Sequence, residues 1–182
     1  SAASDVYKRQ GIYNRCLTAL EAASLYNQGM PTNLLVNRNN YQSGNPTVFN
    51  TKQVDFDGTD DFLKVEDSSN LRGMAALTVC CWVKFDSKSD YAKVLDYSST
   101  SGNSERKYRI QLNNATDQKI SFLIANTSDS TSIVTSTNAF PTDRWVHIVG
   151  TFDNSLSSNR QSLYIDGVLE NTATAFTETI NN

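Results

Sequence analysis

The sequence contains little cysteine and histidine, which excludes several kinds of site. Its cysteines are Cys16, Cys80 and Cys81, in a chain of 182 residues. Neighbouring strand residues point to opposite faces, and two adjacent cysteines are too close for relaxed disulfide geometry. We therefore expect thiols, with no disulfide framework and no zinc site. The only histidine is His147, and neither a Gly-x-Ser-x-Gly motif nor a glycine-rich phosphate loop accompanies it, which argues against nucleophilic catalysis.

The chain also lacks a charge excess and a long apolar segment. Sixteen Lys and Arg residues stand against nineteen Asp and Glu residues, for a formal net charge of −3, and the charges are scattered. Nucleic acid is therefore not an expected partner. No apolar run approaches the ~20 residues that a membrane span needs, and the N-terminus has no signal-peptide pattern, so we predict no membrane insertion.

The first ten residues, SAASDVYKRQ, differ from all that follows. The part DVYKRQ resembles the translation of a transposon-end adaptor used in DNA library preparation. We predict that residues 1–10 are adaptor-derived and non-native, and we leave them out of the predicted fold. A natural basic segment or a frayed strand is the alternative. An adaptor origin would indicate an environmental sequence of viral or bacterial source.

One short helix is predicted, over about residues 19–27. Thr18 is a suitable N-cap, and Glu21 three residues later completes a capping box. Leu20 and Ala23 share one face of this helix by their spacing. Residues 30–50 are rich in asparagine and are interpreted as a linker, in which NLLV is the only apolar run and a possible short strand.

From Val54 onward the apolar residues alternate with polar ones, which predicts short strands. The segment VDFDGTDDFLKVED predicts a strand, a tight turn at Asp57-Gly58 and a second strand containing Phe62, Leu63 and Val65. Further strands are predicted at 77–85, 92–97, 107–112, 119–125, 131–136, 145–152 and 161–169. This spacing indicates an all-β fold, an antiparallel sandwich of two sheets. The expected core between them comprises Val79, Cys81, Val83, Ile148, Phe152, Leu163 and Ile165.

Four segments in order resemble the laminin G-like, concanavalin A-like jelly-roll family: VDFDGTDDFLKVEDSSNLR, LTVCCWVKF, DRWVHIVGTFDN and SLYIDGVLE. The resemblance covers roughly residues 54–170. It implies that residues 51–182 form a jelly-roll β-sandwich, incomplete at its C-terminus. Residues 11–29 look like the final strand and capped helix of a preceding module, so the chain resembles a slice of a tandem array.

The resemblance does not bring a catalytic site with it. Glucanases of this fold carry Glu-x-Asp-x-x-Glu on one strand, and the sequence has no such triplet. We predict that the protein is not an enzyme but a recognition or adhesion module, which binds a glycan or a protein on a cell exterior or a virion. A structural spacer in a phage tail or surface fibre and an accessory carbohydrate-binding module of a secreted hydrolase are the alternatives. Neighbouring modules of the same chain are further expected partners.

Two small sets of residues are candidate sites. Trp82, Trp145 and His147 could contact a ligand, although core or sheet packing is the preferred interpretation of the tryptophans. Asp57, Asp60 and Asp61 could bind Ca²⁺, because oxygen ligands converging in one loop are what this ion requires. A turn whose carboxylates face water is the preferred alternative for them.

The loops between strands are the expected contact regions for a ligand. Loops at the ends of a sandwich are polar and are positioned by a rigid scaffold. We expect the contacts to come from loops 86–92, 98–106 and 153–160.

Overall fold

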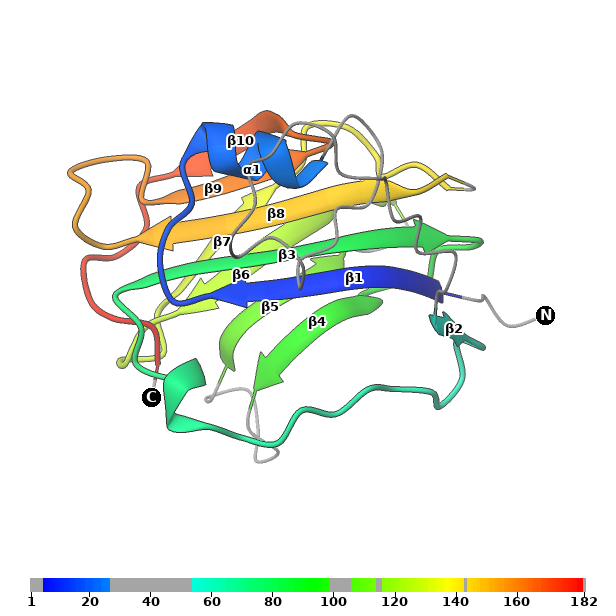
Figure 1. The fold of residues 1–182 in the computed structure, drawn as a ribbon, viewed down its shortest axis with the longest axis horizontal. Helices are drawn as coiled ribbons and strands as arrows, with labels where there is room; N and C mark the ends of the chain where they lie inside the picture. Colours follow the sequence, from blue (N-terminus) through cyan, green and yellow to red (C-terminus); the bar gives the residue numbers. More distant parts are fainter. Residues whose placement is uncertain (1–4, 27–53, 99–105, 114–115, 143, 182) are drawn as a thin grey trace, which may run out of the picture.

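The chain folds into two antiparallel sheets packed face to face (Figure 1). The computed structural model describes residues 5–26, 54–98, 106–113, 116–142 and 144–181. The predicted linker at 30–50, with its NLLV segment, lies outside the described residues. In the described part of the chain, no helix is long and apolar enough to cross a membrane.

The larger sheet has six strands in the order β10-β9-β8-β3-β1-β2, and the smaller has four in the order β4-β5-β6-β7. The six strands are β1 (Asp5–Tyr13), β2 (Val54–Phe56), β3 (Ala76–Phe85), β8 (Val146–Asp153), β9 (Gln161–Ile165) and β10 (Val168–Ala173). The four are β4 (Lys93–Ser98), β5 (Arg106–Leu112), β6 (Ile120–Ala125) and β7 (Thr131–Thr135). The helical elements of the described residues are α1 (Ala19–Tyr26) and a 3₁₀ turn (Ser69–Leu71). The all-β sandwich with one short N-terminal helix is therefore confirmed.

The core lies between the two sheets, as the alternation in β3 predicts. Six of the seven predicted core residues belong to the main buried cluster, and Ile165 packs against it. One polar side chain also lies in this core: Gln161 of β9 is fully buried, and its Nε2 donates to the carbonyl oxygen of Phe122 in β6 at 2.8 Å. This bond links the two sheets directly, because β6 belongs to the smaller sheet.

The predicted strand at 161–169 is a hairpin of two strands, β9 and β10. Asp166 and Gly167 form the connection, with φ values of 50° and 78°. Both values lie in the left-handed region that primed two-residue turns require, and Gly167 adopts it without a steric cost.

The predicted second strand after Asp57 is wrong. Phe62, Leu63 and Val65 form no strand, and they are 76%, 70% and 79% exposed. Strand propensity and apolar character are not enough here, because a strand also needs a neighbour that accepts its backbone hydrogen bonds.

Strand β1 includes residues that were left out of the predicted fold. Asp5–Gln10 pair with β3 on one side, and Asp5–Tyr7 also pair with β2 on the other. The ladder is made by backbone groups, which any extended segment without proline can offer to an open edge. This pairing is therefore independent of the origin of residues 1–10.

Helix α1 begins and ends as predicted, within one residue. The nitrogen of Glu21 donates to Thr18 Oγ1 at 3.2 Å, and the nitrogen of Thr18 donates to Glu21 Oε2 at 2.9 Å, which confirms the capping box. The predicted face is not the buried one, since Leu20 and Ala23 are exposed. Ala22 is buried instead, because α1 packs it against Cys80, Val149 and Tyr164 on the outer face of the larger sheet (Figure 1).

Candidate functional site

Several loops meet at the end of the sandwich where β3 ends. Asp5 pairs with both Phe56 and Phe85, so the loop after β2 begins beside the loop after β3. Loop 86–92 is in turn tied to the β5–β6 turn, because Lys88 Nζ donates to Gln118 Oε1 at 3.1 Å. We call this end, with the loops at 57–61, 86–92 and 116–119, the β3-exit end.

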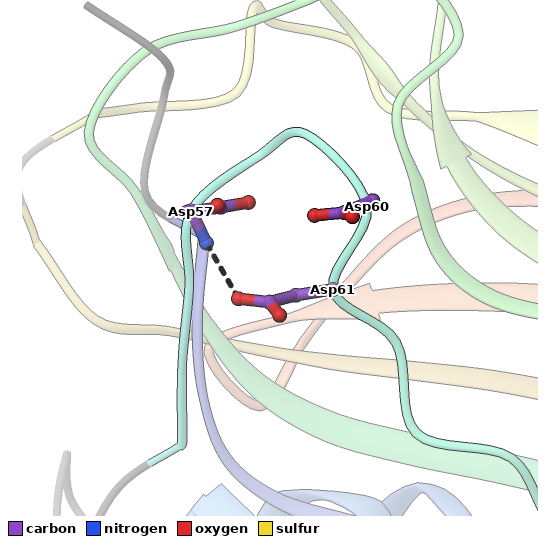
Figure 2. A group of neighbouring side chains, drawn as sticks. All are labelled: Asp57, Asp60 and Asp61. Carbon is purple, nitrogen blue, oxygen red and sulfur yellow. Dashed lines mark hydrogen bonds between the residues drawn. The ribbon is translucent and has the colours of Figure 1, made fainter.

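An acidic cluster lies in the loop after β2 (Figure 2). One oxygen from each of Asp57, Asp60 and Asp61 lies within 4.8 Å of the others, and all three residues are exposed. Two of the carboxylates also hold the turn: the nitrogen of Thr59 donates to Asp57 Oδ1 at 2.8 Å, and the nitrogen of Asp57 donates to Asp61 Oδ2 at 3.1 Å. The predicted calcium candidates are thus brought together, in a loop that their hydrogen bonds also explain as a turn.

Calcium titration distinguishes the two interpretations of this loop. Ca²⁺ takes about six to eight oxygen ligands, whereas this loop offers three exposed carboxylates, two of which already accept backbone hydrogen bonds. We therefore expect calorimetry with Ca²⁺ to show no saturable heat and the melting temperature to stay unchanged. A saturable heat that Asp60→Asn abolishes would establish the loop as a calcium site.

Tyr91 is an exposed aromatic residue at the β3-exit end. It is 57% exposed, and its φ of 57° lies in the left-handed region, which is unusual for a bulky residue. Its backbone nitrogen donates to the carbonyl oxygen of Asn113, just after β5, at 3.2 Å. The fold therefore holds an aromatic ring in solvent through a strained backbone, and such strain is often found at binding sites.

A polar network continues from Asn113 onto the outer face of the smaller sheet. Ser121 Oγ donates to Asn113 Oδ1 at 2.5 Å and lies 3.0 Å from Thr135 Oγ1. Asn113 Nδ2 donates to Asp117 Oδ2 at 3.3 Å. Amide, hydroxyl and carboxylate groups are thus held in a defined arrangement, close in the fold to Tyr91. Ser121 is buried, whereas Asn113 and Asp117 are half-buried, so these two can exchange hydrogen bonds with a hydroxylated ligand.

Trp82 and His147 lie opposite each other on β3 and β8, with ring centroids 5.1 Å apart. Both are buried, on the face of the larger sheet that points away from the core. Burial lowers the pKa of His147 to about 4, and the charge of Asp166 acts in the opposite direction. These two candidates therefore have no open ring face, and the arrangement favours the packing interpretation. Trp145, just before β8, is half-buried and lies at the β3-exit end.

His147 should make stability depend on pH. In the unfolded chain its pKa is near 6.5, and in the fold it is about 4, so between these values the unfolded state binds more protons. The contribution is fully present above about pH 6.5 and is lost as the pH falls towards 4. We expect the free energy of unfolding to decrease by about 2 kcal/mol from about pH 7 to about pH 5.

The control for this pH dependence is His147→Gln, which cannot titrate. Urea unfolding of both proteins across this pH range should give a smaller slope for the variant. Equal slopes would show that carboxylates, not His147, control the acid response.

The two packed antiparallel sheets place this protein in the class of jelly-roll β-sandwiches. A laminin G family model, described as the concanavalin A-like lectin/glucanases superfamily, matches residues 57–182. The chain therefore belongs to this superfamily. No curated protein matches the chain. Laminin G-like domains bind glycan or protein ligands and are typically extracellular.

Sequence reasoning named loop 86–92 but missed Tyr91 and the Asn113 network. Neither the exposure of one tyrosine nor its left-handed backbone has a local sequence signature. Of the other two predicted loops, 153–160 lies at the opposite end, since Asp153 pairs with Ala76 at the start of β3. Most of loop 98–106 lies outside the described residues.

Proposed function

We propose that this protein is a non-catalytic recognition or adhesion module that binds a glycan or a protein on a cell exterior or a virion through its β3-exit end. The observation that carries the proposal is Tyr91, an exposed aromatic residue on strained backbone. Its nitrogen donates to the carbonyl oxygen of Asn113, whose side chain in turn bonds Asp117. An aromatic face next to fixed hydrogen-bonding groups suits the apolar and hydroxylated sides of a sugar. Membership in the lectin and glucanase superfamily supports the same class of ligand.

Tyr91 variants test this proposal on the intact chain. A glycan array first identifies a ligand, and calorimetry then measures its affinity. Tyr91→Ala should weaken binding by roughly tenfold, because it removes the exposed ring. Tyr91→Phe keeps the ring and should retain most of the affinity.

Leu156→Ala is the matched control, because Leu156 is an exposed apolar residue at the opposite end. It should leave the affinity unchanged. An equal loss in both alanine variants would contradict a site at the β3-exit end. No bound glycan on the array, together with no captured protein in a pull-down with the intact chain, would contradict the recognition function.

The remaining alternatives differ in what the purified chain does. A spacer repeat would tolerate deletion of one module from its fibre without loss of attachment. Turnover of any glycan by the purified chain would overturn the proposal that it is non-catalytic.

A further inference from the structure

Strand β1 occupies a position that leaves the larger sheet incomplete without it. It lies between β3 and β2, and its register with β3 runs from Asp5↔Phe85 to Tyr13↔Thr78. Among the described strands β2 pairs with β1 alone, so removing β1 would expose the full length of the β3 edge. A long open edge is a strong acceptor for an added strand.

The residues after β1 dock as part of the same unit. The nitrogen of Leu17 donates to Thr78 Oγ1 at 2.9 Å, and Thr78 Oγ1 donates to the carbonyl oxygen of Arg15 at 2.8 Å. Ala22 of α1 is fully buried against an apolar patch of the larger sheet made of Cys80, Val149 and Tyr164. The edge of β3 and this patch form a two-part acceptor site.

The unit keeps its own shape through internal bonds. Arg15 Nη2 lies 2.7 Å from Glu21 Oε1, and Thr18 caps the helix. These bonds lower the pKa of Glu21 to about 2, with the hydrogen bond from Arg15 as the main cause. Residues 5–26 are thus a strand and a helix joined by local contacts, and the partners described above lie on β2, β3 and the patch.

The segment that joins residues 5–26 to the rest of the chain is long enough for this unit to reach either the acceptor site of its own chain or that of a second copy. Residues 27–53 join α1 to β2, and a segment of that length can extend on the order of 90 Å. Residues 5–26 would make the same contacts at either acceptor site. The effective concentration of the two sites therefore decides whether the unit docks within its own chain or on a second copy.

We propose that the acceptor site beside β3 also takes residues 5–26 from a second copy of this chain, so that copies associate by exchanging the β1–α1 unit. This interaction is separate from ligand binding at the β3-exit end. Leu17 and Ala22 would be exposed in a detached unit, so the unit favours docking in one copy or the other.

A disulfide trap tests the exchange in the full chain. Gly11 lies directly opposite Cys80 in the ladder, so Gly11→Cys would place a thiol within cross-strand reach of Cys80. Cys16→Ser is included in every variant to prevent other crosslinks. Cys81 faces the core, on the opposite side of the sheet from Cys80, so it cannot reach a thiol at position 11. Two forms of the variant with tags of different mass are mixed in denaturant, refolded together and oxidised.

At micromolar concentration we expect mainly intrachain disulfides, whereas refolding at about a hundred times higher concentration should give mixed-tag disulfide dimers on a non-reducing gel. Gly11→Ser, treated identically, should give none. Intrachain crosslinks alone at every concentration would overturn the exchange, and no crosslink at all would overturn the pairing of β1 with β3. The chain without substitutions is refolded in parallel, and light scattering should detect a dimer that persists after dilution; a monomer at every concentration would overturn the proposal.

Discussion

Replacing Val83 with aspartate should lower the free energy of unfolding by about 5 kcal/mol. Val83 lies on β3, is fully buried and belongs to the core cluster between the sheets. A carboxylate at that position would lose its hydration inside a cluster of predominantly apolar side chains. Domains of this size have about 5–15 kcal/mol of stability in total, so the variant should be largely unfolded in water or unfold in very little urea.

Val168→Asp is the matched control for this substitution, because Val168 is 66% exposed on β10. Its effect should stay within about 0.5 kcal/mol. Val83→Ala removes volume without adding charge and should cost about 2 kcal/mol. Wild-type stability of Val83→Asp in urea unfolding would mean that β3 presents its other face to the core.

Adding a single methyl group at Gly150 should also destabilise the fold strongly. A Cβ at this position would lie 2.6 Å from Cγ of Phe122, far inside the ~3.5–4.0 Å at which carbon atoms pack. Gly150 is on β8 of the larger sheet, and the Phe122 ring reaches it from β6 of the smaller one. The ring is fully buried, so it cannot move without displacing its neighbours. Gly150→Ala should therefore cost about 3 kcal/mol in chemical denaturation.

Phe122→Leu tests whether the ring is the cause. Alone it should be destabilising, because it leaves a cavity. Combined with Gly150→Ala it should cost less than the sum of the two single substitutions, by at least about 1 kcal/mol. Strict additivity would show that the methyl group clashes with something other than Phe122.

The features that sequence reasoning predicted well are those with a local cause. The alternation in LTVCCWVKF places Val79, Cys81 and Val83 on one face of β3, because side chains in any strand alternate with a period of two. The capping box of Thr18 and Glu21 joins residues three positions apart. Asp166-Gly167 makes its hairpin because glycine accepts a positive φ.

The features that it missed depend on residues far apart in the chain. Phe62, Leu63 and Val65 have the composition of a strand, yet no strand in the described part of the chain pairs with them. Leu20 shares a helical face with Ala23, yet the sheet beneath α1 receives Ala22 instead.

The sequence by itself determined the all-β class, the faces of the main strands, the helix cap and the lack of a glucanase triplet, since each is a matter of composition or of neighbours within a few positions. Only the tertiary structure decided that β1 fills the place beside β3, that Phe122 needs a glycine at position 150, and that Tyr91 stands in solvent beside Asn113. The physical reason is that a local pattern specifies which way a side chain points. Strand order, close packing between sheets and the meeting of loops are set by which distant segments bury each other's backbone and apolar surface.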